Sequence, residues 1–196
     1  MKRVLLIVPP TGKYIREDRC QTPIEKLKTV ALRPPIDIMY SAAAFEQAGC
    51  SCRLIDLPAE GKSWDDLRSE LREFNPDILA ISITTPSLEQ DVRAAEMAKE
   101  INPAIFAIAK GAHFNTLDLD AMERYSALDA VLQGEYEITC YEIGKGRPLE
   151  SIAGMTWRDT DGKIRRNPPR PFCEDLDSLP FPARHLVRNE IYIRPD

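Results

Sequence analysis

The stretch FNPDILAISITTPS, residues 74–87, contains a helix stop, a strand and the start of a further helix. The Asn-Pro-Asp at 75–77 ends the helical pattern before it. Ile78–Ile83 is then apolar without alternation, which is typical of a strand buried on both faces. Ser87 opens an amphipathic helix. A strand that stands between two helices predicts one βα unit of a parallel sheet.

The same unit recurs on both sides of this stretch, five times between residues 1 and 146. Pro34-Pro35 suits the first turn of a helix, and Gly49 suits its stop. The alternation predicts a five-stranded, flavodoxin-like or Rossmann-like parallel sheet of order 2-1-3-4-5 with helices on both faces. The predicted strands are Met1–Val8, Ser51–Asp56, Ile78–Ile83, Ala104–Ala109 and Ala130–Leu132, and the predicted helices are Ile36–Ala48, Trp64–Phe74, Ser87–Ile101, Leu117–Tyr125 and Glu135–Ile143.

The pattern changes after Gly146. Ile152–Arg158 and Lys163–Asn167 flank an Asp-Gly turn, which predicts a β-hairpin. Residues 168–182 contain five prolines and are expected to form an extended linker. We therefore divide the chain into an α/β domain (1–146) and a hairpin with a linker (147–196), and expect the chain to be a piece of a longer protein.

Composition excludes several classes of protein. The net charge of −5 does not favour nucleic-acid binding, and no apolar run approaches the roughly 20 residues that span a bilayer. Met1–Val8 reads as a strand and not as a signal peptide, so we expect a cytoplasmic protein. The five cysteines form no CxxC or CxxxCxxC, which favours reduced thiols over a metal site.

Four predicted loops meet at the carboxyl edge of the sheet, where open α/β sheets bind ligands. They contain small residues, which let a ligand approach the backbone, and hydroxyls, which bind phosphates or amides. Ordinary turns and helix caps would have the same composition, but four such loops on one edge favour a site. The candidates are Thr11, Gly12, Ser82, Thr84, Thr85, Lys110, Gly111, His113, Gly134 and Glu135.

No standard catalytic or nucleotide motif accompanies these residues. GxGxxG, GxxxxGK[ST] and GxSxG are all absent, so we predict no catalytic residue in this chain. His113 reads as a hydrogen-bond donor, as a metal ligand or as a histidine of a polar loop. The polar segment Thr11–Arg33 is too long for a simple βα connection and is either disordered or functional.

Several passages taken together resemble one family. They are VLLIVPP, the RPP before the first helix, AAAFEQAG followed by CRLID, FNPDILAISITTPS, KGAHFN, LDAVLQGEYE, GMTWRDTDGKIRRNPPRP and DLDSLPFPAR. Their order and spacing resemble the N-terminal half of cobalamin-dependent radical S-adenosylmethionine (SAM) enzymes over essentially the whole chain.

The resemblance implies a domain that holds cobalamin, with the dimethylbenzimidazole tail buried in the sheet edge. Ser82 and Thr84 match the hydroxyl loop beside the tail, and Gly111 with His113 matches a GGPH-like turn. Gly134-Glu135 matches the turn after the fifth strand, while Thr11-Gly12 stands where the corrin would lie. A downstream barrel, a partner in cis, would carry the CxxxCxxC [4Fe–4S] site and cleave SAM, often for methyl transfer.

The sequence departs from that pattern at two places. The cobalt-ligating DxHxxG is absent, and Lys110 replaces a glycine, where its side chain would obstruct the tail or bind its phosphate. We therefore keep two alternatives to a cobalamin domain that is inert by itself. One is a docking module that has lost the cofactor, and the other is a flavodoxin-like binder of flavin or another nucleotide.

Overall fold

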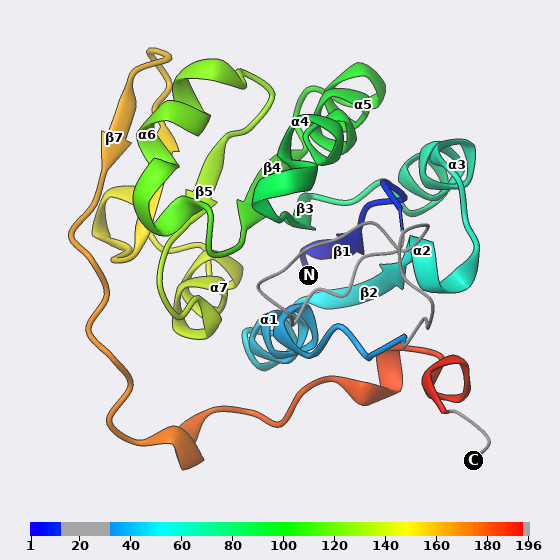
Figure 1. Cartoon of the computed structure of the whole chain (residues 1–196). Helices are drawn as coiled ribbons and strands as arrows, with labels where there is room; N and C mark the ends of the chain where they lie inside the picture. The colour runs from blue at the N-terminus through cyan, green and yellow to red at the C-terminus, as the bar shows by residue number, and fades with distance from the viewer. Residues whose placement is uncertain (13–31, 194–196) are drawn as a thin grey trace.

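The structure is a computed structural model, and the residues it describes are 1–12 and 32–193 (Figure 1). Most of the polar segment 11–33 therefore lies outside the described residues. Within those residues, no helix combines the length and the apolarity needed to cross a membrane.

The core of the fold is one sheet with the strand order β2-β1-β3-β4-β5-β6-β7. Strands β1 to β5 are parallel, which confirms the predicted order 2-1-3-4-5. The predicted number of five strands is corrected to seven, because the hairpin pairs antiparallel with β5 instead of standing apart. The strands are β1 Arg3–Val8, β2 Ser51–Asp56, β3 Ile78–Ser82, β4 Phe106–Lys110, β5 Ala130–Leu132, β6 Met155–Arg158 and β7 Ile164–Arg166.

Helices cover both faces of this sheet, as the alternation of strands and helices predicts (Figure 1). The α-helices are α1 Ile36–Gln47, α2 Leu57–Glu60, α3 Trp64–Phe74, α4 Leu88–Asp91, α5 Arg93–Ile101, α6 Phe114–Arg124 and α7 Glu137–Gly144. Short 3-10 turns are η2 Thr85–Ser87, η3 Leu149–Ser151, η4 Leu176–Ser178, η5 Arg184–Leu186 and η6 Asn189–Tyr192.

Strand β1 shows how the sequence builds two cores. Successive side chains of a strand point to opposite faces, so both faces of a central strand must be apolar. Leu5 and Ile7 pack with α3, α5 and α6 on one face. Val4, Leu6 and Val8 pack with α1 and α7 on the other. All five are fully buried, which explains why the run shows no alternation.

Three predicted helices differ from the structure at their ends. Helix α6 begins at Phe114 and not at Leu117, whose non-helical φ of −110° marks a kink inside the helix. Helix α7 begins at Glu137, because Gly134 before it has a left-handed φ of 66° and Tyr136 is not yet helical. The predicted helix Ser87–Ile101 is divided into η2, α4 and α5.

Buried polar contacts attach the hairpin to the α/β layers. The Thr156 hydroxyl on β6 donates to Asp118 Oδ2 on α6 at 2.5 Å, and Gln133 Nε2 donates to Thr156 Oγ1 at 3.2 Å. Asp118 is 1% exposed and pairs with Arg166 on β7 at 3.0 Å. The hairpin is therefore built into the sheet, while the division of the chain at residue 146 stays a prediction.

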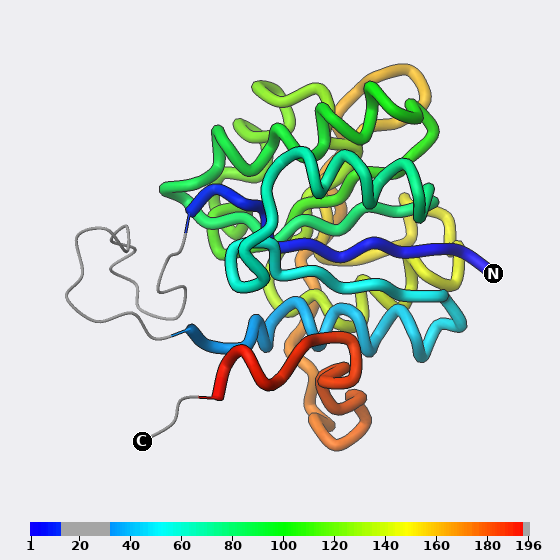
Figure 2. The backbone as a smooth tube through the Cα atoms, turned by 90° about the vertical axis from the view of Figure 1, so that its right-hand side faces the viewer, coloured from blue at the N-terminus to red at the C-terminus, as the bar shows by residue number. Residues whose placement is uncertain are grey.

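The C-terminal stretch lies along the domain instead of leaving it. Ala183 is buried and donates its N–H to the Met39 carbonyl of α1 at 3.1 Å. Tyr192 donates its hydroxyl to Asp56 at the end of β2 at 3.0 Å. Figure 2 shows this segment, in red, running alongside α1. The predicted linker is thus extended at first and then packed.

Removing the Thr156 hydroxyl should weaken the attachment of the hairpin. Thr156→Val leaves Asp118 Oδ2 and the amide of Gln133 without this partner, so the free energy of unfolding should fall by about 2 kcal/mol. Thr160→Val in the exposed hairpin turn is the matched control. Urea unfolding followed by circular dichroism measures both variants, and equal stability of the two would contradict the attachment.

Candidate functional site

The predicted site residues gather at the carboxyl edge of the parallel strands. Pairing sets Ser82 opposite Lys110, and Lys110 opposite Leu132, so β3, β4 and β5 end at one level. The loops after β1, β3, β4 and β5 consequently leave the sheet along one edge, which we call the rim and define by residues 9–12, 82–87, 110–113 and 133–135.

A hydroxyl network joins the first two loops of the rim. Thr11 Oγ1 donates to Asp91 Oδ1 at 2.6 Å, and Ser87 Oγ donates to Asp91 Oδ2 at 2.5 Å. Since the single hydroxyl proton of Ser87 goes to the carboxylate, the 2.6 Å contact between Thr84 and Ser87 is donated by Thr84. The half-buried Thr84 oxygen therefore keeps its acceptor capacity for a ligand N–H.

Lys110 is the most unusual residue of the rim because its side chain is 1% exposed. Its ammonium lies 2.5 Å from Asp37 Oδ2 and 3.3 Å from the Tyr136 hydroxyl, and 4.4 Å from the centre of the Tyr136 ring. The Ser82 hydroxyl also donates to Asp37 Oδ2, at 3.4 Å. Lys110 thus joins β4 to the first turn of α1 and the start of α7.

The electrostatics of this group keep Lys110 charged. Burial by itself would lower the pKa of the Lys110 ammonium, but the Asp37 carboxylate and Tyr136 raise it by more, so the net shift is upward. Burial raises the pKa of the Tyr136 hydroxyl, which stays neutral. The rim therefore contains a buried cation, balanced by a carboxylate that is 50% exposed.

Gly111 permits the loops after β3 and β4 to touch. The Ile83 N–H donates to the Lys110 carbonyl at 2.9 Å, and Gly111 has a φ of 149°. A Cβ at this position would lie 2.0 Å from the Ile83 carbonyl oxygen. No other residue fits there without moving one of the two loops.

His113 lies beside the hydroxyl loop, with Nδ1 3.2 Å from Thr85 Oγ1. Its Nε2 is buried and has no hydrogen-bond partner among the described residues. Burial lowers the pKa of the imidazole, which is therefore neutral at pH 7. If the Thr85 hydroxyl donates to Nδ1, then Nε2 carries the proton and can donate to a ligand. The role of His113 as a donor to a ligand stays a prediction.

The turn after β5 offers less to a ligand than its sequence suggests. The Gly134 N–H is already used, since it donates to Asn115 Oδ1 at 2.8 Å. Glu135 is exposed, and its side chain forms no hydrogen bond with another described residue of the rim. The neighbouring Tyr136 reaches Lys110 instead.

Four residues that contact the rim were not predicted from the sequence. Asp37, Tyr136, Asn115 and Asp91 all lie on helices or helix starts and contact the rim across elements. Of these four, only Asp37 could have been noticed in the sequence, because it is an acidic residue in the first turn of a helix that follows two prolines. The others become visible only once the helices are packed.

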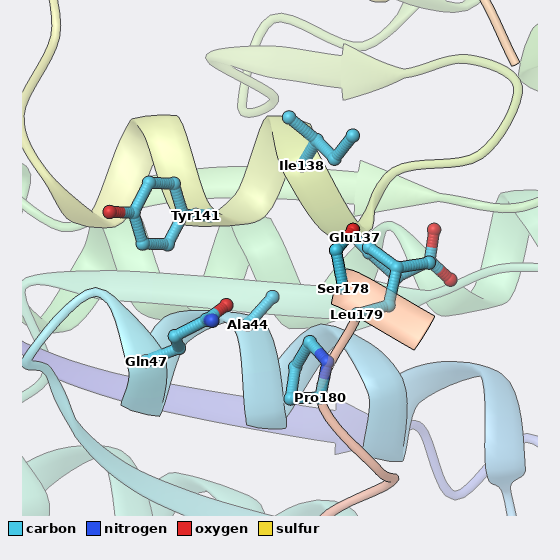
Figure 3. Close-up of a pocket in the computed structure, with 8 residues that line it drawn as sticks. All are labelled: Ala44, Gln47, Glu137, Ile138, Tyr141, Ser178, Leu179 and Pro180. Atoms are coloured by element: carbon cyan, nitrogen blue, oxygen red, sulfur yellow. The ribbon is translucent and has the colours of Figure 1, made fainter. Parts of the chain in front are cut away.

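A separate groove lies between α1 and α7, crossed by the linker (Figure 3). Its lining is Ala44, Gln47, Glu137, Ile138, Tyr141, Ser178, Leu179 and Pro180. No predicted site residue lines this groove, so it is not the predicted site.

The rim suits a large polar ligand that carries amides and one anionic group. Thr84 offers an acceptor, His113 Nε2 is a buried polar atom that lacks a partner, and Lys110 provides a positive charge. Cobalamin, with its ring of amide side chains and its single phosphodiester, has this chemistry. The residues of the rim therefore fit the predicted cofactor.

The fold is that of a doubly wound α/β domain, and its candidate site lies at the carboxyl edge of the sheet. Comparison with known proteins identifies the family to which this domain belongs. Residues 28–144 match the B12 binding domain family, and the chain belongs to that family. The matched range contains the rim loops after β3, β4 and β5, while Thr11 and Gly12 precede it.

Individual relatives agree with this assignment. An uncharacterized methyltransferase of Pyrococcus horikoshii is 30% identical over 194 residues, which is 97% of this chain and 40% of the relative. The cobalamin-dependent SAM radical enzyme OxsB, solved with aqua-cobalamin and SAM, superposes with a TM-score of 0.72 at 15% identity, over 97% of this chain and 25% of its own.

A second solved structure, the radical SAM methyltransferase TsrM of Kitasatospora setae, gives a TM-score of 0.66 at 17% identity. It covers 87% of this chain, which spans 31% of TsrM. At these identities the two structures establish the fold. The chain thus spans well under half of the length of each of these three proteins.

Replacing Gly111 should disturb the rim more than replacing a glycine elsewhere. Gly111→Ala forces its Cβ against the Ile83 carbonyl and should cost about 3 kcal/mol of unfolding free energy. Gly162→Ala in the hairpin is the control, because its φ is also positive, at 79°, but nothing lies within 4 Å of the added Cβ. It should cost about 1 kcal/mol. Equal losses in urea unfolding would show that the contact with Ile83 carries no strain.

Proposed function

We propose that this chain binds cobalamin at the rim. The observation that carries the proposal is the match of residues 28–144 to the B12 binding domain family, because this range builds three of the four rim loops. The hydrogen bond from Thr11 to Asp91 brings the fourth loop to the same place.

Different residues of the rim would contact different parts of cobalamin. Thr84 and His113 would bind the amide groups of cobalamin, and Ser82 and Lys110 would bind its phosphate-bearing tail. Gly111 allows the loops after β3 and β4 to stay in contact. Thr11 and Gly12 would lie beside the corrin, and Thr85, Gly134 and Glu135 would border it. Bound cobalamin supplies a cobalt ion that can carry a methyl group, while these side chains bind and orient the molecule.

We further propose that the domain serves a cobalamin-dependent radical SAM enzyme, with methyl transfer as the favoured reaction. The names of the P. horikoshii relative and of TsrM support this, as does the small share of those proteins that the chain spans. The [4Fe–4S] cluster and SAM would belong to another domain in cis, since the sequence contains no CxxxCxxC.

Cobalamin binding is tested by mixing the purified protein with hydroxocobalamin and separating them by gel filtration. We expect the corrin absorbance to elute with the protein. Thr85→Trp places an indole on the exposed hydroxyl loop and should weaken retention at least about tenfold by steric exclusion. Thr160→Trp in the distant hairpin turn is the control and should bind as the unchanged protein does.

Free corrin with the unchanged protein would contradict the proposal. Equal retention by both tryptophan variants would place the ligand away from the rim. If the protein is instead yellow with flavin absorbance when purified, the flavodoxin-like alternative replaces cobalamin.

The proposed role in a radical SAM enzyme is tested by sequencing the gene that encodes this chain. The reading frame that encodes this chain should also encode a CxxxCxxC beyond Asp196. A reading frame without these cysteines would contradict the radical SAM assignment, but it would leave cobalamin binding intact.

A further inference from the structure

The ion pair of Lys110 with Asp37 is asymmetric in its burial. Lys110 is 1% exposed, whereas the Asp37 side chain is 50% exposed. A buried cation that loses its counter-ion is strongly destabilising, while a half-exposed carboxylate regains water when it moves away. The structure therefore requires an anion beside Lys110 but does not require that this anion be Asp37.

The position that Asp37 Oδ2 occupies is surrounded by hydrogen-bond donors and therefore suits an anion. Besides the Lys110 ammonium at 2.5 Å, the Ser82 hydroxyl donates to the same oxygen at 3.4 Å. The Tyr136 hydroxyl and ring contact the ammonium from α7 and fix its place. The two donors, Ser82 and Lys110, belong to β3 and β4, so they stay in place when the Asp37 side chain on α1 moves.

We propose that Asp37 is a resident anion that a phosphate group of the ligand replaces, and that Lys110 thereby selects corrinoids that carry a phosphate. The inference rests on the proposed function and names the feature of the ligand that the rim recognises. A carboxylate and a phosphodiester each carry one negative charge, so the exchange keeps Lys110 neutralised. No covalent bond changes.

Cobalamin and cobinamide separate this inference from cobalamin binding in general. Cobinamide has the same corrin ring but lacks the phosphate-linked nucleotide. We expect the unchanged protein to bind cyanocobalamin roughly tenfold or more tightly than cyanocobinamide, because a charge-assisted hydrogen bond to phosphate is lost in the second ligand. Equilibrium dialysis with detection of the corrin absorbance measures both affinities.

Two substitutions give opposite results if the inference holds. Lys110→Met removes the cation and should bring the two affinities together, through a loss of cobalamin binding of roughly tenfold. Asp37→Asn removes the competing charge and should tighten cobalamin binding severalfold while leaving cobinamide unchanged. Lys110→Met leaves a half-exposed carboxylate that water can solvate, so this variant should fold even if Asp37→Asn, which leaves the buried ammonium unpaired, does not. Circular dichroism checks the folding of both variants.

Lys99→Met is the matched control. Lys99 also forms a lysine–aspartate pair, with Asp129 at 2.6 Å, but at the opposite edge of the sheet. The variant should lose stability and keep the ratio of the two affinities.

The inference is overturned if Lys110→Met keeps the ratio of the unchanged protein, or if Asp37→Asn weakens cobalamin relative to cobinamide. In either case cobalamin binding at the rim stands. If the unchanged protein binds neither corrinoid, the proposed function fails and the inference fails with it.

Discussion

The contact between the Gly111 backbone and the Ile83 carbonyl is the constraint on which the rim depends. It closes the gap between the loops after β3 and β4, where any side chain would meet the oxygen at 2.0 Å. On one side of this contact the hydroxyl network reaches Asp91, and on the other Lys110 reaches Asp37. The strands of a parallel sheet end at one level, and this contact, together with the contact of His113 with Thr85, joins the two loops into one surface.

The buried lysine gives the rim its chemical character. Removing a charge from water is costly unless it is paired, and Lys110 is paired by residues of α1 and α7. The same contacts join the two helices to the sheet edge, so the buried charge also fixes the helices around the rim. Under our proposal, a ligand that brings its own anion replaces Asp37 beside this lysine.

The sequence predicted the sheet order well because five apolar runs and five helical patterns follow one another with clear breaks. It did not predict that β6 would pair with β5, since pairing of an antiparallel edge strand leaves no local signal. The candidate residues lie at the carboxyl edge, as expected, because strand ends can be predicted from the sequence. That they bind a ligand stays a prediction. Their partners Asp37, Asn115 and Tyr136 were missed, because contacts between elements depend on how the helices pack.

Amide-resolved NMR during a titration with hydroxocobalamin shows where a corrinoid binds. Binding at the carboxyl edge of the sheet should concentrate the chemical-shift changes at the N–H groups of Ser82, Gly111 and His113. Changes centred on Ala44, Tyr141 and Leu179 would instead place the ligand in the groove between α1 and α7. That result, or the absence of any change, would contradict binding at the rim.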